Sequence, residues 1–346
     1  MEKVLLGMSG GVDSAAAAII LKKQGLEVIG VTMKLLERDK DIKDDAAILD
    51  AKKVCDTLGI EHVVVDYSKE FKEKVIGDFV NKYNEGKTPN PCIVCNKYFK
   101  FGMLWEKAKE FGCKYIATGH YAIIEEVDGE YILKRAVSKE KDQSYVLYNI
   151  SRDMIPFVKF PLGTFGSKEE IRKVLEDEGL EIISKKKDSQ DICFIPDNDH
   201  IRFLEGYIRK KEGNIVYKDG TVLGKHLGTH RYTIGQRKGL GVSYKSPLYV
   251  MDLDTNTNSV VVGDKEDIFK TSLVADNINL LIDKEEIEKK ELAAKVRYSS
   301  EAYSANVKVE GDKLKIKFKD KVKAITKGQS VVIYDGDRVV AGGEII

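Results

Sequence analysis

The N-terminal part of the chain alternates between short apolar runs and longer stretches in which apolar residues recur at helical spacing. The apolar runs predict buried strands, which are expected at residues 3–8, 26–33, 61–66 and 114–118. The helical spacing predicts helices, which are expected at residues 13–24, 46–58, 71–83 and 97–111. A further helix is expected after Ser167, because Ser167 and Glu170 form the S-x-x-E pattern of a capping box. Strands that alternate with helices form a parallel sheet with helices on its faces, so residues 1–197 are predicted to form an α/β domain.

From about residue 197 the pattern changes to short strands separated by turns. Asp219 and Gly220 lie between two apolar runs and predict a hairpin, and apolar residues alternate regularly over residues 307–318. Residues 224–241 are rich in Gly, Lys, Arg and His without a clear period, so we expect an exposed loop there. The sequence therefore predicts a small, mostly-β central domain at residues 198–270 and an antiparallel β-barrel at residues 271–346.

The composition is that of a globular protein rather than a disordered or membrane-spanning chain. The 346 residues are 42% apolar and 33% charged, and this length favours two or three domains. The longest apolar run, at residues 15–21, is shorter than the ~20 residues that cross a bilayer. The N-terminus has no stretch typical of a signal peptide. We therefore expect a cytoplasmic protein with no membrane contact.

Charge alone neither indicates nor excludes a nucleic-acid partner. Lys and Arg number 57 against 56 for Asp and Glu, which gives a formal net charge of +1. Phosphate contacts need a local basic face rather than a basic protein, and we expect such faces at residues 185–187 and 231–238. Binding through these faces should weaken steeply as the salt concentration rises.

The sharpest local motif is the string G-M-S-G-G-V-D-S between the first predicted strand and the first predicted helix. Glycines let the backbone approach a ligand closely, and the first N–H groups of the following helix bind anions. Ser9 and Ser14 add hydroxyl donors, and Asp13 supplies a carboxylate suited to Mg²⁺. The string is not the kinase-type G-x-x-x-x-G-K loop. The plainer alternative is a Gly-rich turn that only packs the helix onto the strand.

This string resembles the pyrophosphate loop of the N-type ATP pyrophosphatases. The resemblance implies an enzyme that binds ATP with Mg²⁺, adenylates an oxygen atom of its substrate and releases pyrophosphate. A nucleophile then displaces AMP. The loop implies adenylation but does not identify the substrate.

Three of the five cysteines lie where chemistry is expected. Cys92 and Cys95 form a C-x-x-C just before a predicted helix, and Cys193 ends the string K-K-D-S-Q-D-I-C. Thiols near a helix N-terminus and beside Lys have depressed pKa values and are reactive. Cys55, in a helix, and Cys113, entering a strand, fit buried inert thiols instead. A C-x-x-C alone also occurs in redox, zinc and cluster sites, but a four-ligand zinc site lacks its second pair here.

Over nearly the whole chain the sequence resembles the tRNA-specific 2-thiouridylases, a branch of the same superfamily. Beyond the loop, the resemblance rests on T-P-N-P-x-x-x-C-N-K, A-T-G-H-Y, K-D-Q-S-Y, K-K-D-S-Q-D-I-C-F-I, G-Q-R-K-G-L-G and K-V-R-Y. It implies an enzyme that uses ATP to replace the 2-oxygen of the wobble uridine U34 with sulfur in tRNAs for Lys, Glu and Gln. It also implies central and C-terminal domains that hold the tRNA, and a sulfur donor such as a sulfur-relay protein, a cysteine desulfurase or free sulfide.

The same resemblance implies roles for individual residues. ATP contacts are implied for Gly7, Met8, Ser9, Gly10, Gly11, Val12, Asp13, Ser14, Met33 and Gly119. Contacts near the target base are implied for Asn90, Pro91 and Cys92, and other tRNA contacts for His120, Lys141, Asp142, Gln143, Arg297, Tyr298 and Gln329. In the family's persulfide scheme, Cys193 carries the sulfur and attacks the adenylated C2. Cys95 then resolves the spent sulfur through a transient disulfide.

Cys92 departs from the family pattern, since many relatives have Asp at this position. The thiols of Cys92, Cys95 and Cys193 together resemble the ligand set of the cluster-dependent tRNA thiolases. In those enzymes a [4Fe–4S] cluster held by Cys thiolates presents its unique iron to sulfide. The sequence therefore leaves two routes of sulfur delivery open, a Cys193 persulfide and an iron–sulfur cluster.

Two other classes of protein share part of this pattern. A synthetase that amidates an adenylated small molecule would have the same loop and fold, but it needs neither three placed thiols nor a barrel. A non-enzymatic tRNA-binding or metal-storage module would bind its ligand without forming AMP. The intact S-G-G-V-D-S string argues against the second class, because a decayed site would be expected to lose Asp13 or a glycine.

Overall fold

The computed structural model describes residues 1–37, 45–186 and 192–346, and the chain divides into two compact units. The first unit comprises residues 1–75, 92–190 and 337–339, and the second comprises residues 76–91, 191–336 and 340–346. Lys187 and the D-S-Q-D string that follows it lie outside the described residues.

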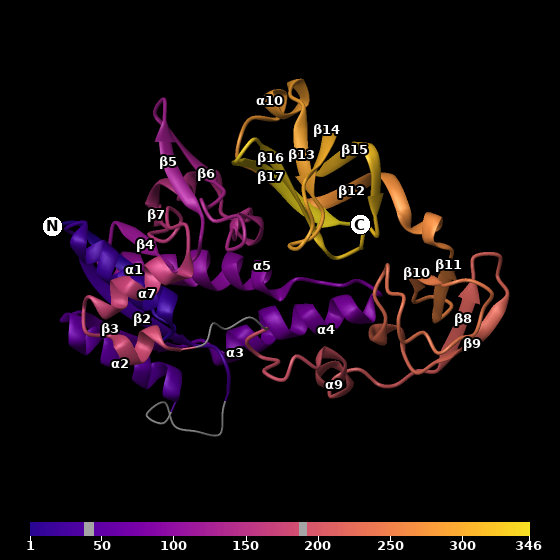
Figure 1. Ribbon diagram of the computed structural model, residues 1–346, viewed down its shortest axis with the longest axis horizontal. Helices are drawn as coiled ribbons and strands as arrows, with labels where there is room; N and C mark the ends of the chain where they lie inside the picture. The colour runs from indigo at the N-terminus through magenta and orange to yellow at the C-terminus, as the bar shows by residue number, and fades with distance from the viewer. Residues whose placement is uncertain (38–44, 187–191) are drawn as a thin grey trace. The chain divides into compact units, whose positions relative to one another are not determined.

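The first unit is built on a parallel sheet whose strand order is β3-β2-β1-β4-β7 (Figure 1). Its strands are β1 (Lys3–Gly7), β2 (Glu27–Lys34), β3 (Glu61–Asp66), β4 (Tyr115–Ala117) and β7 (Val158–Lys159). The central strand β1 is buried on both faces, with Val4, Leu5 and Leu6 fully inaccessible, as in parallel sheets covered by helices. The chain order reverses between β1 and β4, and in such sheets ligands bind beyond the carboxyl ends of the strands at this point.

Helices cover the sheet of the first unit. They include α1 (Val12–Lys23), α2 (Ala46–Leu58), α7 (Lys168–Glu176) and α8 (Glu181–Ser184). Four consecutive alanines of α1, at residues 15–18, are fully buried, and such small side chains let α1 pack closely. Helix α2 has the predicted bounds because Asp45 caps its first turn and Gly59, at φ 61°, ends it.

The helical segment around the C-x-x-C differs from the prediction. The sequence predicted an irregular stretch up to residue 96, whereas α5 (Pro91–Cys95) is already helical and contains both cysteines. A π-helical stretch (Asn96–Met103) and α6 (Leu104–Glu110) follow. Pro91 takes the first helical position, where its missing N–H costs no hydrogen bond. Other short helices are α3 (Ser68–Phe71), α4 (Gly77–Asn84) and α9 (His200–Glu205).

The second unit contains a four-stranded sheet in the order β10-β11-β8-β9. The strands are β8 (Gly213–Tyr217), β9 (Val222–His226), β10 (Tyr249–Asp254) and β11 (Ser259–Gly263). The predicted hairpin joins β8 to β9, with Gly220 at φ 92° and Asp219 accepting from the Thr221 N–H at 2.9 Å. The expectation of an exposed loop at residues 224–241 was partly wrong. His226, His230, Tyr232 and Ile234 are buried there, and Tyr232 and Leu240 belong to the apolar core of the sheet.

The second unit also contains a closed antiparallel barrel of six strands, which confirms the predicted fold class. Its order is β12-β15-β14-β13-β16-β17, and β17 pairs back with β12. The strands are β12 (Phe269–Leu280), β13 (Leu292–Lys295), β14 (Tyr303–Glu310), β15 (Lys313–Lys323), β16 (Ser330–Asp335) and β17 (Arg338–Ile345), and α10 (Lys284–Lys289) lies between β12 and β13. In β15 the buried apolar residues Leu314, Ile316 and Phe318 alternate with exposed lysines, as the predicted period of two requires.

A hairpin of β5 (Ile123–Val127) and β6 (Glu130–Lys134) in the first unit was not predicted from the sequence. Within the described part of the chain, no helix is long and apolar enough to cross a membrane.

Candidate functional site

The Gly-rich loop joins β1 to α1 at the carboxyl edge of the parallel sheet. Gly10 has φ +73°, and a Cβ added there would lie 2.4 Å from the carbonyl oxygen of Ala47. Only glycine therefore fits between the loop and the start of α2. The Met8 N–H donates to the Val31 carbonyl at 2.8 Å, and Thr32 Oγ1 donates to the Met8 carbonyl at 2.8 Å. These bonds fix the loop against β2, the strand whose carboxyl end carries Met33.

The two serines fold the loop over the first turn of α1. Ser14 Oγ accepts from the Ser9 N–H at 3.2 Å, lies 3.2 Å from Ser9 Oγ and donates to the Gly11 carbonyl at 3.1 Å. Gly11 is the N-cap residue and has no side chain to satisfy the first N–H groups of α1. Those groups and the helix dipole can hold an anion such as a phosphate.

Asp13, in the first turn of α1, is bound by two side chains that the sequence analysis did not select. Lys168 Nζ and Tyr121 Oη each donate to Asp13 Oδ1 at 2.6 Å. Lys168 opens α7, and its side chain is only 9% exposed. One oxygen of the predicted Mg²⁺ ligand is thus already engaged by an ammonium and a phenol.

Gly119 and Asp13, both predicted to lie at the ATP, are brought together by the strand order. A Cβ added to Gly119 would lie 2.9 Å from the backbone of Asp13, so the chain after β4 approaches α1 as closely as its backbone allows. Gln143 supports this region, since its Oε1 accepts from the Tyr121 N–H at 2.9 Å and its own N–H donates to the Tyr121 carbonyl at 2.8 Å.

Lys186 is a second cation that the structure places on the loop. Its Nζ donates to the Gly10 carbonyl at 3.0 Å and forms an ion pair with Asp50 on α2. Residues 185–187 were expected to form a basic face for phosphate contacts with tRNA. The structure gives Lys186 a role in holding the loop, while Lys187 lies outside the described residues.

Asp142, predicted at the tRNA, is 8% exposed and accepts three hydrogen bonds inside the first unit. Its donors are the Ala136 N–H at 3.1 Å, the Ser144 N–H at 3.1 Å and Ser144 Oγ at 2.9 Å. The neighbouring Lys141 is partly exposed. Within this motif the structure therefore directs Asp142 inward, and the implied tRNA contact of Lys141 stays a prediction.

His120 is buried and neutral. Its Nδ1 lies 2.7 Å from Thr118 Oγ1 and its Nε2 lies 3.3 Å from Lys100 Nζ. Burial, with a smaller effect from the Lys100 charge, lowers the pKa of His120 well below its ordinary value. Because Lys100 can only donate, Nε2 must accept, and the ring proton sits on Nδ1. The side chain contacts the rings of Phe101 and Phe160 and is 8% exposed. Its implied contact with tRNA stays a prediction.

Cys92 and Cys95 both lie in the short helix α5, three residues apart and so on the same side of the helix. Cys92 is exposed and Cys95 is 8% exposed. Asn96, which follows, is buried and donates to the Val146 carbonyl at 2.9 Å, which anchors this segment. The depressed pKa expected for Cys92 was wrong. Although the residue as a whole is exposed, desolvation of its thiol group raises the pKa, and the charge of Lys100 lowers it by less.

The two cysteines predicted to be inert are buried, as expected. Cys55 packs against Gly30, where an added Cβ would lie 2.8 Å from its sulfur. Burial raises the pKa of Cys55 to about 11 and also raises that of Cys113. Neither thiol forms a thiolate readily at neutral pH.

The remaining predicted residues belong to the second unit. Cys193 is exposed beside Phe194, which is buried against Phe79 and Phe203 at ring-centroid distances of 5.4 and 5.2 Å. Gln329 Nε2 donates to the Thr88 carbonyl at 2.6 Å, and the Thr88 N–H donates to the Lys327 carbonyl at 2.9 Å. The barrel therefore holds the T-P-N-P segment that contains Asn90 and Pro91.

The iron–sulfur hypothesis receives no support from the geometry of either unit. Cys92 and Cys95 belong to the first unit and Cys193 to the second. Among residues 1–37, 45–186 and 192–346, no group of three or more His, Cys, Asp or Glu side chains is placed to hold a metal ion. We therefore derive no chemical step through a cluster.

Three family models match the chain in succession. Residues 2–197 match the tRNA methyl transferase HUP domain, residues 201–264 the tRNA methyl transferase PRC-barrel domain, and residues 270–345 the aminomethyltransferase beta-barrel domain.

Curated relatives match over their full length. The tRNA-specific 2-thiouridylase MnmA of Clostridium kluyveri is 46% identical over 100% of this chain and 99% of its own. The protein of the same name from Clostridium perfringens is 48% identical over 99% of this chain and 98% of its own.

Solved structures show weaker similarity. A 4-thiouridine synthetase–RNA complex with bound ATP is 20% identical, with a TM-score of 0.39, over 59% of this chain and 50% of that one. NMN synthetase from Francisella tularensis is 17% identical, with a TM-score of 0.33, over 54% of this chain and 66% of that one.

Proposed function

This chain belongs to the tRNA-specific 2-thiouridylase family, and on that premise we propose that it replaces the 2-oxygen of wobble uridine U34 with sulfur in tRNAs for Lys, Glu and Gln. The enzyme is a tRNA-uridine 2-sulfurtransferase that consumes ATP. The observation that carries the proposal is the Gly-rich loop over the first turn of α1, braced by Lys168 and Tyr121 on Asp13, in a chain that matches these relatives end to end.

The loop is proposed to bind the phosphates of ATP. Its backbone N–H groups and the N-terminus of α1 face the negative charge, with Ser9 and Ser14 as hydroxyl donors. Met33 and Gly119, at the carboxyl ends of β2 and β4, are proposed to contact the rest of the nucleotide. Mg²⁺ would offset the phosphate charge, and Asp13 is the carboxylate at the loop that could hold it.

Adenylation is needed because the C2 oxygen of uridine is a poor leaving group, whereas AMP is a good one. The C2 oxygen of uridine attacks the α-phosphorus of ATP, an O–P bond forms, and pyrophosphate departs. The former carbonyl oxygen then leaves as part of AMP when sulfur attacks C2. Lys168, at the loop, is placed to stabilise negative charge that develops on the phosphates.

Sulfur delivery is proposed to run through a Cys193 persulfide. Its terminal sulfur attacks C2 and AMP leaves. The thiolate of Cys95 then attacks the sulfur of Cys193, so that the S–S bond breaks and its electron pair remains on the sulfur bound to C2. An external thiol must reduce the resulting Cys95–Cys193 disulfide before the next turnover. The persulfide sulfur would come from a sulfur-relay protein or a cysteine desulfurase, whose own persulfide S–S bond breaks as the Cys193 thiolate takes the terminal sulfur. Free sulfide could serve only in place of the external thiol, by attacking Cys193 in the Cys95–Cys193 disulfide, so that the S–S bond breaks, Cys95 leaves as a thiolate and Cys193 becomes the persulfide.

The remaining implied roles concern the tRNA and the compartment. Asn90, Pro91 and Cys92 are proposed to lie at the target base, and Lys141, Tyr298 and Gln329 near the anticodon arm. The wobble base must leave its stack to reach the adenylate, as in other enzymes that modify bases. Because its substrate is tRNA, the enzyme is proposed to act in the cytoplasm.

The routes of sulfur delivery can be separated on anaerobically prepared protein, with and without cluster reconstitution. Iron and acid-labile sulfide per chain are measured, and the same samples are assayed with ATP, Mg²⁺, unmodified tRNA and a persulfide or sulfide donor. The persulfide route predicts 2-thiouridine from iron-free protein, with loss of product in Cys193→Ser and Cys95→Ser. If Cys92→Ala keeps full activity, Cys92 is not a cluster ligand. Product formed only by iron-loaded protein would overturn the persulfide route.

The class of substrate is tested by the dependence of AMP formation on RNA. A thiouridylase should release AMP from ATP only when unmodified tRNA is present. A small-molecule synthetase would be insensitive to tRNA, and a binding module would form no AMP at all.

A further inference from the structure

Lys100 lies in the π-helical stretch Asn96–Met103, which continues the helix that carries Cys92. The residue is partly buried, and its Nζ lies 3.3 Å from Nε2 of the neutral His120. Side chains on a helix lean toward its N-terminus, so the long Lys100 side chain extends toward the turn that carries Cys92. The positive charge of Lys100 lowers the pKa of the Cys92 thiol, as expected for two groups that lie close together. None of the roles implied by the family resemblance falls on Lys100.

The ammonium group of Lys100 has no carboxylate partner. Within the described part of the chain, no Asp or Glu forms an ion pair with Lys100, and its hydrogen bond goes to the ring of His120. Lys109, in the following helix, differs because it pairs with Glu106 at 2.8 Å. Burial of a cation costs free energy unless a negative charge compensates it. A partly buried ammonium without a carboxylate therefore indicates a site where a ligand supplies the negative charge.

His120 orients this ammonium without neutralising it. The ring is buried and uncharged, and its Nδ1 lies 2.7 Å from Thr118 Oγ1, so Nε2 accepts from Lys100. A carboxylate in the place of the ring would cancel much of the positive charge. A neutral imidazole leaves the charge of Lys100, and the other N–H groups of the ammonium, available to a ligand.

The backbone on either side of Lys100 is fixed by buried aromatic rings. Phe99 is fully buried against Phe71, with ring centroids 5.4 Å apart. Phe101 is 3% exposed and lies beside Phe160, with ring centroids 5.9 Å apart. A cation on such a rigid segment needs little reorganisation when negative charge develops next to it, which is the property of groups that stabilise transition states.

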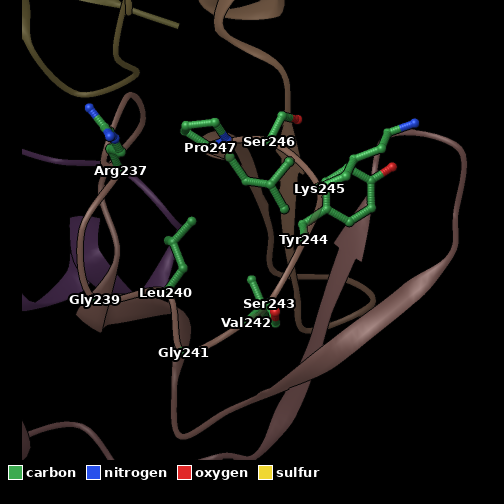
Figure 2. Close-up of a pocket in the computed structure, with 11 residues that line it drawn as sticks. Arg237, Gly239, Leu240, Gly241, Val242, Ser243, Tyr244, Lys245, Ser246 and Pro247 are labelled. Carbon is green, nitrogen blue, oxygen red and sulfur yellow. The ribbon is translucent and has the colours of Figure 1, made fainter.

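The cations at the pocket of the second unit are exposed instead. This pocket of about 530 Å³ is lined by residues 237–248, which include Arg237 and Lys245 (Figure 2). Figure 2 shows that the charged ends of both side chains point away from the pocket, and both residues are exposed. Water and salt therefore screen their charges more than they screen the charge of Lys100.

Arg297, for which the resemblance implies a tRNA contact, donates to oxygens of the second unit. Its Nη2 lies 3.1 Å from the Ile234 carbonyl, 2.6 Å from the Ala324 carbonyl and 2.6 Å from Thr326 Oγ1. The implied tRNA contact of Arg297 stays a prediction. Among the cations described so far, Lys100 combines partial burial with a charge that no carboxylate of the described residues offsets.

The two steps of the proposed reaction place new negative charge at different points. In adenylation the departing pyrophosphate gains the charge, and pyrophosphate is proposed to lie at the loop beside Lys168. In the second step sulfur attacks C2, the bond from C2 to the bridging oxygen breaks, and that oxygen departs with the electron pair as part of AMP. This second charge develops at the target base, which is proposed to lie at Cys92. Lys100 is on the helix that carries Cys92, so its ammonium is suited to the second step.

We propose that Lys100 is a catalytic residue of the second step, in which its ammonium donates to the oxygen that departs from C2 and stabilises the negative charge on AMP. The inference rests on the proposed function, which supplies the adenylated uridine as the ligand. It assigns the two steps to different cations, Lys168 to the departure of pyrophosphate and Lys100 to the departure of AMP.

The two steps can be measured separately with unmodified tRNA. Without a sulfur donor, enzyme and ATP should form pyrophosphate and adenylated tRNA, and a persulfide donor added afterwards should release AMP and yield 2-thiouridine. Lys100→Gln keeps an N–H donor toward His120 but removes the charge. It should form pyrophosphate within about threefold of the wild-type rate, whereas release of AMP and formation of 2-thiouridine should slow about 100-fold. Lys100→Arg keeps the charge and should slow the second step by about tenfold at most.

Lys109→Gln removes an exposed lysine from the neighbouring helix and is the control, which should match wild type in both steps. Thermal unfolding of each variant is measured alongside. Equal slowing of both steps in Lys100→Gln, or an effect no larger than that of Lys109→Gln, overturns the assignment. A Lys100→Arg variant as slow as Lys100→Gln also overturns it, because the charge would then not be what matters. Wild-type enzyme that forms neither pyrophosphate nor 2-thiouridine with tRNA would overturn the proposed function itself, whereas the pattern among the variants overturns the role of Lys100 alone.

Discussion

Lys168 and Asp13 are 155 positions apart in the chain, yet the Lys168 ammonium donates to the Asp13 carboxylate at 2.6 Å. The contact joins the first residue of α7 to the first turn of α1, at the loop proposed to bind ATP. Lys168 is mostly buried, so its charge is little screened by solvent. The pair therefore places a fixed cation where phosphate charge must be held.

Lys168→Met should lower tRNA-dependent AMP formation by about 100-fold, because loss of one preorganised donor at a developing charge costs that order of rate. Tyr121 would still hold Asp13, so the fold should persist. The measurement is AMP release with matched thermal unfolding. Lys173→Met, which removes an exposed lysine from the same helix, is the control and should behave like wild type. Wild-type AMP formation by Lys168→Met would contradict the role of this cation.

Gly119→Ala should impair ATP turnover at least about tenfold, because the new methyl would lie 2.9 Å from the backbone of Asp13 and would displace α1. The KM for ATP and the rate of AMP formation would both be measured. Gly166→Ala is the matched control, since its Cβ would meet only a Glu170 carboxylate oxygen at 3.3 Å, at the end of a flexible side chain. Equal activity of the two variants would show that the close approach is not needed.

The parts of this site that the sequence predicted are those determined by local pattern. The glycines and serines of residues 7–14 are consecutive, and α2 is bounded by the local caps Asp45 and Gly59. The contacts of Lys168 and Lys186 with the loop were missed because their partners lie 155 and 176 positions away, and a periodic pattern in the sequence does not indicate such distant pairs. The helix start at Pro91 was missed because proline is common both in turns and at the first helical position.

His120 should make the protein less stable at acidic pH. Burial lowers its pKa in the folded state well below the ordinary 6.5, so below about pH 6.5 the unfolded chain binds a proton that the folded protein does not. The free energy of unfolding should therefore fall as the pH drops below about 6.5 and should level off above it.

The contribution of His120 can be isolated with His120→Asn. Tm would be measured from pH 5 to pH 8 for both proteins. His62, His226 and His230 also have pKa values lowered by burial and supply a background slope in each. The variant should lose less Tm between pH 6.5 and pH 5 than wild type. Parallel curves would mean that His120 is protonated without cost in the folded state.

Gln329→Ala should raise the KM for tRNA about fivefold while leaving the KM for ATP unchanged, since one hydrogen bond to the Thr88 carbonyl is lost. The reason is that Gln329 holds the T-P-N-P segment proposed to lie at the target base. Asn306→Ala removes an exposed amide from the same barrel and is the control. A change confined to the KM for ATP would place Gln329 outside the tRNA contact.

The most direct test of the central claim is nucleoside mass spectrometry of unmodified tRNA for Lys, Glu or Gln after incubation with the enzyme, ATP, Mg²⁺ and a persulfide donor, with AMP measured in the same reaction. We expect 2-thiouridine at position 34, formed in proportion to AMP and absent when ATP is omitted. AMP released without tRNA, or sulfur found at another base, would contradict it.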